Sequence, residues 1–93
     1  MQPDVAKFAA DSTVQALLHA TTADNMLQTA NRIVAKAKAV APHVAQADLV
    51  NGLTIAYCPV VTNDAHLSPP QRIEQLDQFS ETLYTQLTQK GQD

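Results

Sequence analysis

The sequence is poor in glycine and in aromatic residues. Its 93 residues include two glycines, and aromatic side chains make up only 4% of the chain. An all-β domain of this length needs many tight turns, and glycine adopts their positive φ angles at the lowest cost. The apolar residues, 45% of the chain, include many alanines, which form helices readily and strands poorly. The composition therefore predicts an all-α fold.

Cysteine and clustered cations are also scarce. Cys58 is the only cysteine, which excludes an internal disulfide and any zinc motif built from cysteine pairs. The six Lys and Arg residues are scattered and the net charge is −3, so we expect no nucleic-acid partner. The two glycines lie far apart and form no phosphate loop, and we expect no cofactor. No apolar run approaches the roughly 18 residues that a membrane-spanning helix needs.

The first residues, MQPDVAKFAAD, lack the basic flank and the apolar stretch of a secretory signal. On this ground we expect a cytoplasmic protein. Only 16% of the residues are charged, and Gln and Thr are frequent, as in many exported bacterial proteins. A periplasmic or secreted protein whose signal peptide was removed is therefore the alternative.

Capping patterns divide the chain into about four segments. Residues 12–15 (STVQ) and 68–71 (SPPQ) have the spacing of a capping box, and residues 22–25 (TADN) are a weaker version. Residues 23–41 repeat apolar side chains every three or four positions, which predicts an amphipathic helix. The cations of this segment fall outside the apolar stripe and are interpreted as a solvated face: Arg32, Lys36 and Lys38.

The last helix is predicted from Ser68 to about Lys90, with Gly91 suited to a left-handed C-terminal cap. Ser80 interrupts the apolar side of this helix. A small side chain there would let a neighbouring helix approach closely, and its hydroxyl could bond the carbonyl of Leu76.

The first segment does not form one apolar stripe, so we expect a break at Asp11 and Ser12. Residues 1–11 are then a flexible arm or a short extra turn. A chain of this length is enough for one compact domain and too short for two. The predicted architecture is a single helical domain over residues 1–93, built as a bundle of three to four helices.

The third segment has two interpretations. As a helix from about His43 to Cys58, it would be apolar on both sides, with Val44 and Ile55 opposite its main stripe, and Pro59 would end it. As strands, it would be a hairpin that turns at Asn51-Gly52, which gives an α+β fold. We favour the helix, because two lone strands form a marginal sheet.

Four residues are candidates for a reactive or metal-binding site. Cys58, Asp64 and His66 lie close in sequence, and His43 is a further candidate base or ligand. A convincing zinc motif has two pairs of ligands, with the members of each pair only a few residues apart, and this chain has no such pattern. We therefore assign no metal ligand, and we assign no catalytic residue. Cys58 is interpreted as a small buried apolar residue, and Asp64 as a turn residue.

These observations favour a noncatalytic helical module that binds a protein partner or forms a homo-oligomer. The surplus of apolar positions suggests its interaction surface, which we predict to include Val44, Ile55 and Phe79. The alternative is a small enzyme or metal-binding protein that uses Cys58 with His66 or His43. A third hypothesis is a carrier that holds an apolar small molecule inside the bundle.

Overall fold

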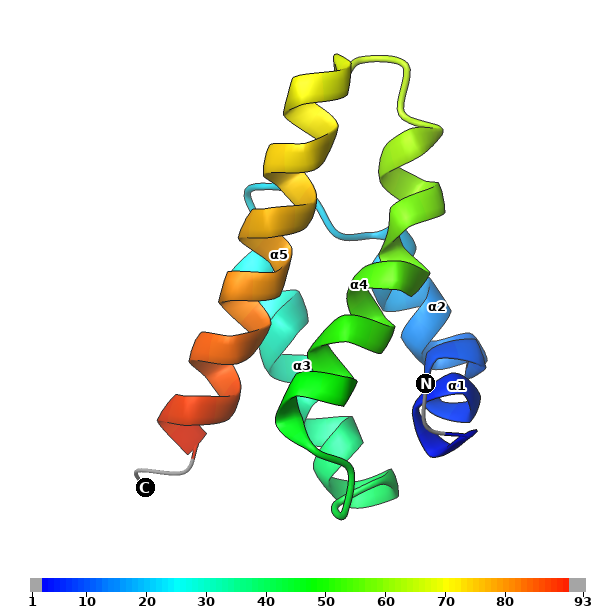
Figure 1. Cartoon of the computed structure of the whole chain (residues 1–93), viewed down its shortest axis with the longest axis vertical. Coiled ribbons are helices and arrows are strands. Elements are labelled where there is room, and N and C mark those ends of the chain that lie inside the picture. The colour runs from blue at the N-terminus through cyan, green and yellow to red at the C-terminus, as the bar shows by residue number, and fades with distance from the viewer. Residues whose placement is uncertain (1–2, 91–93) are drawn as a thin grey trace.

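The structure is a computed structural model that describes residues 3–90 and contains five helices and no strand within that range (Figure 1). The helices are α1 (Pro3–Ala10), α2 (Ser12–His19), α3 (Met26–Val40), α4 (Gln46–Thr62) and α5 (Pro69–Lys90). Helix α4 packs against α5, α1 and α2, and α3 packs against α5. The predicted all-α bundle is confirmed. The hairpin alternative is wrong, because Asn51 and Gly52 lie inside α4.

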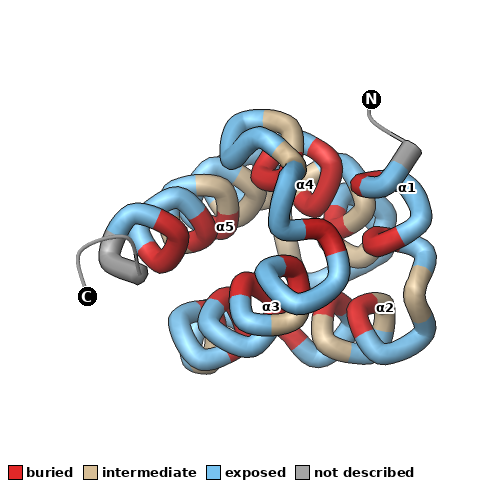
Figure 2. Tube along the Cα trace, turned by 90° about the horizontal axis from the view of Figure 1, so that it is seen from below, coloured by how far each residue is buried: buried red, intermediate tan, exposed pale blue. Residues whose placement is uncertain are grey.

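The core is formed by side chains from all five helices (Figure 2). Its largest fully buried side chains include Phe8, Leu18, Ile33, Tyr57 and Phe79. The rings of Tyr57 and Phe79 pack with their centroids 4.5 Å apart and join α4 to α5. Burial of each large apolar side chain stabilises the fold by about 1.5–3 kcal/mol. These two rings therefore fix how the two longest helices lie against each other.

The first described residues form a two-turn helix rather than a flexible arm. Helix α1 buries Val5 and Phe8 against the rest of the bundle, because their spacing of three residues places both on one side. The helix ends before Asp11, so the predicted break in the first segment is correct. Residues 1 and 2 lie outside the described part of the chain.

Helix α2 is capped one residue earlier than the capping-box pattern indicates. The carboxylate of Asp11, not a hydroxyl of Ser12, accepts a hydrogen bond from the backbone N–H of Thr13 at 2.8 Å. This hydrogen bond, together with Lys36, whose ammonium lies 3.6 Å away, lowers the pKa of Asp11 below its usual value. Gln15 turns back instead and donates to the carbonyl of Ala9. The side chains of Asp11 and Gln15 thus fix the corner between α1 and α2.

Helix α4 is displaced toward the C-terminus relative to the predicted helix. It begins at Gln46, after Ala45 in an extended conformation, rather than near His43. The prediction that Pro59 ends it is also wrong, because Pro59 lies inside the helix. Proline removes one backbone donor, but the helix continues to Thr62, and at its C-terminal cap the N–H of Asn63 donates to the carbonyl of Pro59 at 3.0 Å. The final turn persists because it buries Val61.

Helix α5 begins where the capping pattern predicts. The side-chain oxygen of Gln71 accepts a hydrogen bond from the N–H of Ser68 at 2.9 Å, which is one half of a capping box. Pro69 and Pro70 occupy the first turn, where no amide hydrogen is needed. The proposed cap residue Gly91 lies outside the described residues.

Candidate interaction surface

Two small polar side chains join α4 and α5 at mid-length. The hydroxyl oxygens of Thr54 and Ser80 lie 2.7 Å apart. Thr54 donates its only hydroxyl hydrogen to the carbonyl of Val50 at 2.8 Å, so Ser80 is the donor of the pair. The predicted close approach of a helix at Ser80 is therefore present, but the hydroxyl bonds Thr54 rather than the carbonyl of Leu76.

Large apolar side chains remain exposed on either side of this contact. Ile73 is 63% exposed and Tyr84 is 43% exposed. They lie seven residues before and four residues after Ser80, which places all three on the same side of α5. On α4, Ile55 follows Thr54 and is 60% exposed. We call the surface formed by Ile55, Ile73 and Tyr84, with the exposed α4 residues Asn51, Cys58 and Thr62, the α4–α5 face.

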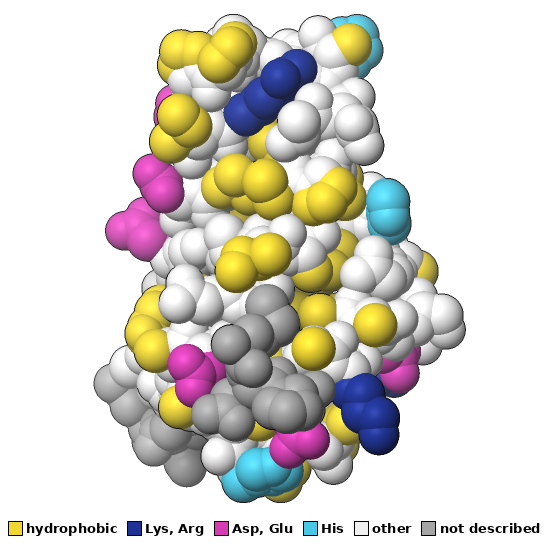
Figure 3. Space-filling view, turned by 45° about the vertical axis from the view of Figure 1, so that its right-hand side comes forward, with side chains coloured by type: hydrophobic (Ala, Val, Ile, Leu, Met, Phe, Trp, Pro, Cys, Tyr) yellow, Lys and Arg dark blue, Asp and Glu magenta, His cyan; other side chains and the backbone are white. Residues whose placement is uncertain are grey.

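The solvent side of α4 carries no charge. Its exposed positions are all uncharged: Gln46, Ala47, Asn51, Ile55, Cys58, Pro59 and Thr62. The only charged residue of the helix, Asp48, is half-buried. Figure 3 shows hydrophobic side chains gathered over the middle of this side of the molecule, with a Lys or Arg side chain above them and acidic side chains at the left edge and in the lower part. A solvent-facing helix side is normally rich in charge, whereas the centres of protein interfaces are depleted of it.

The predicted interaction residues do not form one surface. Only Ile55 is exposed; Val44 is half-buried and packs on the core, and Phe79 is fully buried. Phe79 turns inward because α5 packs against both α3 and α4, so a wide part of its circumference is covered. The prediction also missed Ile73 and Tyr84, which the apolar pattern assigns to the buried side. Their position on the same side as the small Ser80 is the signal that could have found them.

The four candidates for a reactive or metal-binding site are spread over the molecule. Cys58 is exposed rather than buried, and its sulfur contacts the hydroxyl of Thr62 at 3.8 Å. The carboxylate of Asp64 accepts a hydrogen bond from the N–H of His66 at 2.9 Å, so it shapes a turn, as predicted. His43 lies in the loop between α3 and α4 and pairs with Asp4 of α1. Within residues 3–90, no group of three or more His, Cys, Asp or Glu side chains could hold a metal ion.

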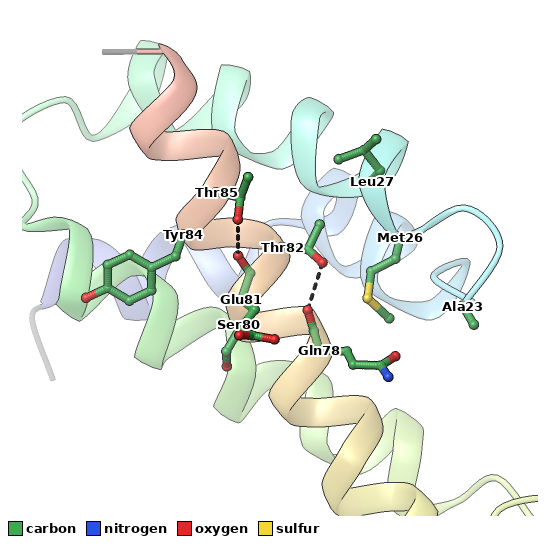
Figure 4. Close-up of a pocket in the computed structure, with 9 residues that line it drawn as sticks. All are labelled: Ala23, Met26, Leu27, Gln78, Ser80, Glu81, Thr82, Tyr84 and Thr85. Atoms are coloured by element: carbon green, nitrogen blue, oxygen red, sulfur yellow. Dashed lines mark hydrogen bonds between the residues drawn. The ribbon is translucent and has the colours of Figure 1, made fainter. Parts of the chain in front are cut away.

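A separate groove lies between the start of α3 and the middle of α5 (Figure 4). Its volume is about 780 Å³, and it opens to solvent. Met26 and Leu27 reach into it from α3, and Thr82 and Thr85 face them from α5. Both threonine hydroxyls donate to carbonyls of their own helix, at 2.7 and 2.9 Å, so the groove offers no free hydroxyl hydrogen at these positions.

Comparisons with family models, curated proteins and solved structures found no match to this chain. Among the described helices, none combines the length and the apolar character needed to cross a membrane. What the protein does is therefore argued from the geometry and chemistry of these surfaces.

Proposed function

We propose that the protein is a noncatalytic helical interaction module that binds a protein partner through the α4–α5 face. The observation that carries this proposal is the absence of charge among the exposed residues of α4, next to three large exposed apolar side chains. Removing Ile55, Ile73 and Tyr84 from water would favour association, and the exposed residues of α4 include no ionised group that would have to be desolvated.

The shape of the face indicates the kind of partner. Two helices that pack side by side leave a shallow furrow along their contact, and a third helix can lay its apolar side into such a furrow. Here Thr54 and Ser80 form the floor of the furrow, because their side chains are small and half-buried. Asp77 of α5 lies on this side too, four residues after Ile73. The partner that fits is therefore a protein with an apolar helix side that places no acidic residue against Asp77.

The position of Cys58 allows a direct test. It is the only cysteine and it is exposed on the α4–α5 face, so a photoreactive maleimide attached to it would lie beside a bound partner. Irradiation in an extract of the source cells is expected to give one discrete adduct. Its mass identifies the partner, and twice the chain mass would indicate a second copy.

Capture alone does not establish the face as the binding site. Ile73→Asp places a charge on the face and is expected to reduce the yield of the adduct at least about tenfold. The matched control is Val40→Asp, because Val40 is 59% exposed on α3, away from the face. An adduct that forms equally well with Ile73→Asp, or no discrete adduct at all, contradicts the proposal.

A further inference from the structure

The groove between α3 and α5 adjoins the α4–α5 face along α5, because Ser80 and Tyr84 also contribute to its lining. Figure 4 shows Tyr84 pointing to the opposite side of α5 from Met26 and Leu27. Leu27, which is 58% exposed, shares its side of α3 with Asn31 and Lys38, because these residues follow it by four and eleven positions. On α5, residues 74, 78, 81 and 85 form the adjoining stripe at the same kind of spacing. We call these two stripes the α3–α5 face.

The two stripes of this face carry opposite charges. On α3, Lys38 is the one charged residue of the stripe. Arg32 and Lys36 lie on other sides of the helix, and Lys36 pairs with Asp11. On α5, the stripe carries two acidic residues, Glu74 and Glu81, and no cation. Glu81 and Leu27 both line the groove. Lys38 borders a second hollow, whose lining includes Leu87 of α5 and Leu49 of α4. The face is therefore acidic at the level of Leu27 and basic at Lys38.

We infer that the α3–α5 face pairs with the same face of a second copy, in antiparallel orientation, so that Lys38 of each copy meets Glu81 of the other. Lys38 lies about 16 Å along the helix from the level of Leu27, at 1.5 Å per residue. A two-fold axis across the helices exchanges the two ends of the face. It therefore places the basic end of each copy against the acidic end of the other, so that every contact occurs twice in the dimer.

Two independent features support a second copy as the occupant. The acidic end of the face in one copy complements the basic end in the other copy. A second copy therefore provides the opposite charges that each end requires. The residues between the two ends are also suitable for contact, because Asn31 and Thr85 carry no charge and the hydroxyl of Thr85 is already bonded within α5.

The test is the oligomeric state of the intact chain by sedimentation velocity. At low salt we expect a dimer that dissociates on dilution and on raising the salt, because exposed charge pairs are screened. Lys38→Glu and Glu81→Lys, taken singly, are each expected to weaken the dimer about tenfold, since each replaces two attractive pairs by two repulsive ones. The double variant Lys38→Glu/Glu81→Lys should recover the dimer, because the pairs form again with exchanged signs.

The control for Lys38→Glu is Lys7→Glu, the same change at an exposed position on α1, which should leave the dimer intact. Circular dichroism verifies that each variant is folded. A chain that stays monomeric at low salt up to roughly 1 mM overturns the inference. So does a double variant that associates no better than the single ones. Substitutions of Ile73 test the partner-binding face and should not alter the dimer, so the two proposals can fail separately.

Discussion

Val5 of α1 packs directly over Gly52 of α4, so closely that a β-carbon on Gly52 would lie 2.1 Å from Cγ1 of Val5. Val5 is fully buried, so a methyl group added at position 52 would force Val5 to turn within the core or α1 to move away from α4. Glycine is thus required at position 52 for the contact between two helices, and the backbone there is ordinary helix.

Gly52→Ala is expected to destabilise the protein by about 1–3 kcal/mol, because overpacking outweighs the better helix propensity of alanine, about 1 kcal/mol. Urea unfolding measures the change. In a Val5→Ala background the same substitution should cost much less, since the obstructing methyl groups are gone. Asn51→Ala, at the exposed neighbouring position, should change the stability by less than about 0.5 kcal/mol.

Tyr57→Phe is expected to cost about 1–2 kcal/mol in the free energy of unfolding. The Tyr57 hydroxyl donates to the carbonyl of Thr21 at 3.0 Å in the buried core and accepts from the Gln75 amide at 3.4 Å. Its loss leaves that carbonyl without this donor. Tyr84→Phe is the matched control, because Tyr84 is 43% exposed, and it should be nearly neutral. Equal effects of the two substitutions would contradict this role of Tyr57.

The cap at Asp11 predicts a pH dependence. Its pKa is lowered in the folded protein, chiefly by the N–H of Thr13, so its charged form adds stability at neutral pH. This contribution disappears as the pH falls through the lowered pKa, below the usual aspartate value of about 4. Asp11→Asn lacks the charge at every pH. Thermal unfolding should therefore show wild type losing its advantage over Asp11→Asn on acidification, and a difference that stays constant into the acid range would argue against the cap.

The exposure of Cys58 predicts its reactivity. Its thiol lies on the solvent side of α4, so a disulfide reagent should modify it in the folded protein at nearly the rate found in denaturant. Thiol titration by absorbance measures both rates. Protection of a hundredfold or more would mean that the surface of α4 is covered, which would be expected only in an assembly of the chain.

Much of the fold follows from local patterns. The stripe in residues 23–41 predicts α3, and the SPPQ pattern predicts the start of α5, because each depends on neighbours within one turn. The Asn51-Gly52 pair shows the limit. It favours a hairpin locally, whereas its glycine is needed because Val5, 47 residues away in sequence, packs against it. Helix periodicity contains no information on such a distant contact.

The candidate surface was harder to predict for the same reason. Periodicity groups Ile73 and Tyr84 with the buried residues of α5, and it places Phe79 at the edge of that group. Which of them is covered depends on where α3 and α4 lie around α5. The structure buries Phe79 and exposes the other two. The absence of charge in residues 46–62, by contrast, is visible in the sequence, with Asp48 as the single exception.

The most direct test of the central claim is the affinity of the purified partner, identified by crosslinking from Cys58, for variants of the α4–α5 face. Isothermal titration calorimetry should show a negative heat-capacity change on binding, because apolar surface is buried. Ile73→Asp and Tyr84→Asp should each weaken binding at least about tenfold, and Val40→Asp should leave it within about twofold. Equal affinities for all of these variants would show that the partner binds elsewhere.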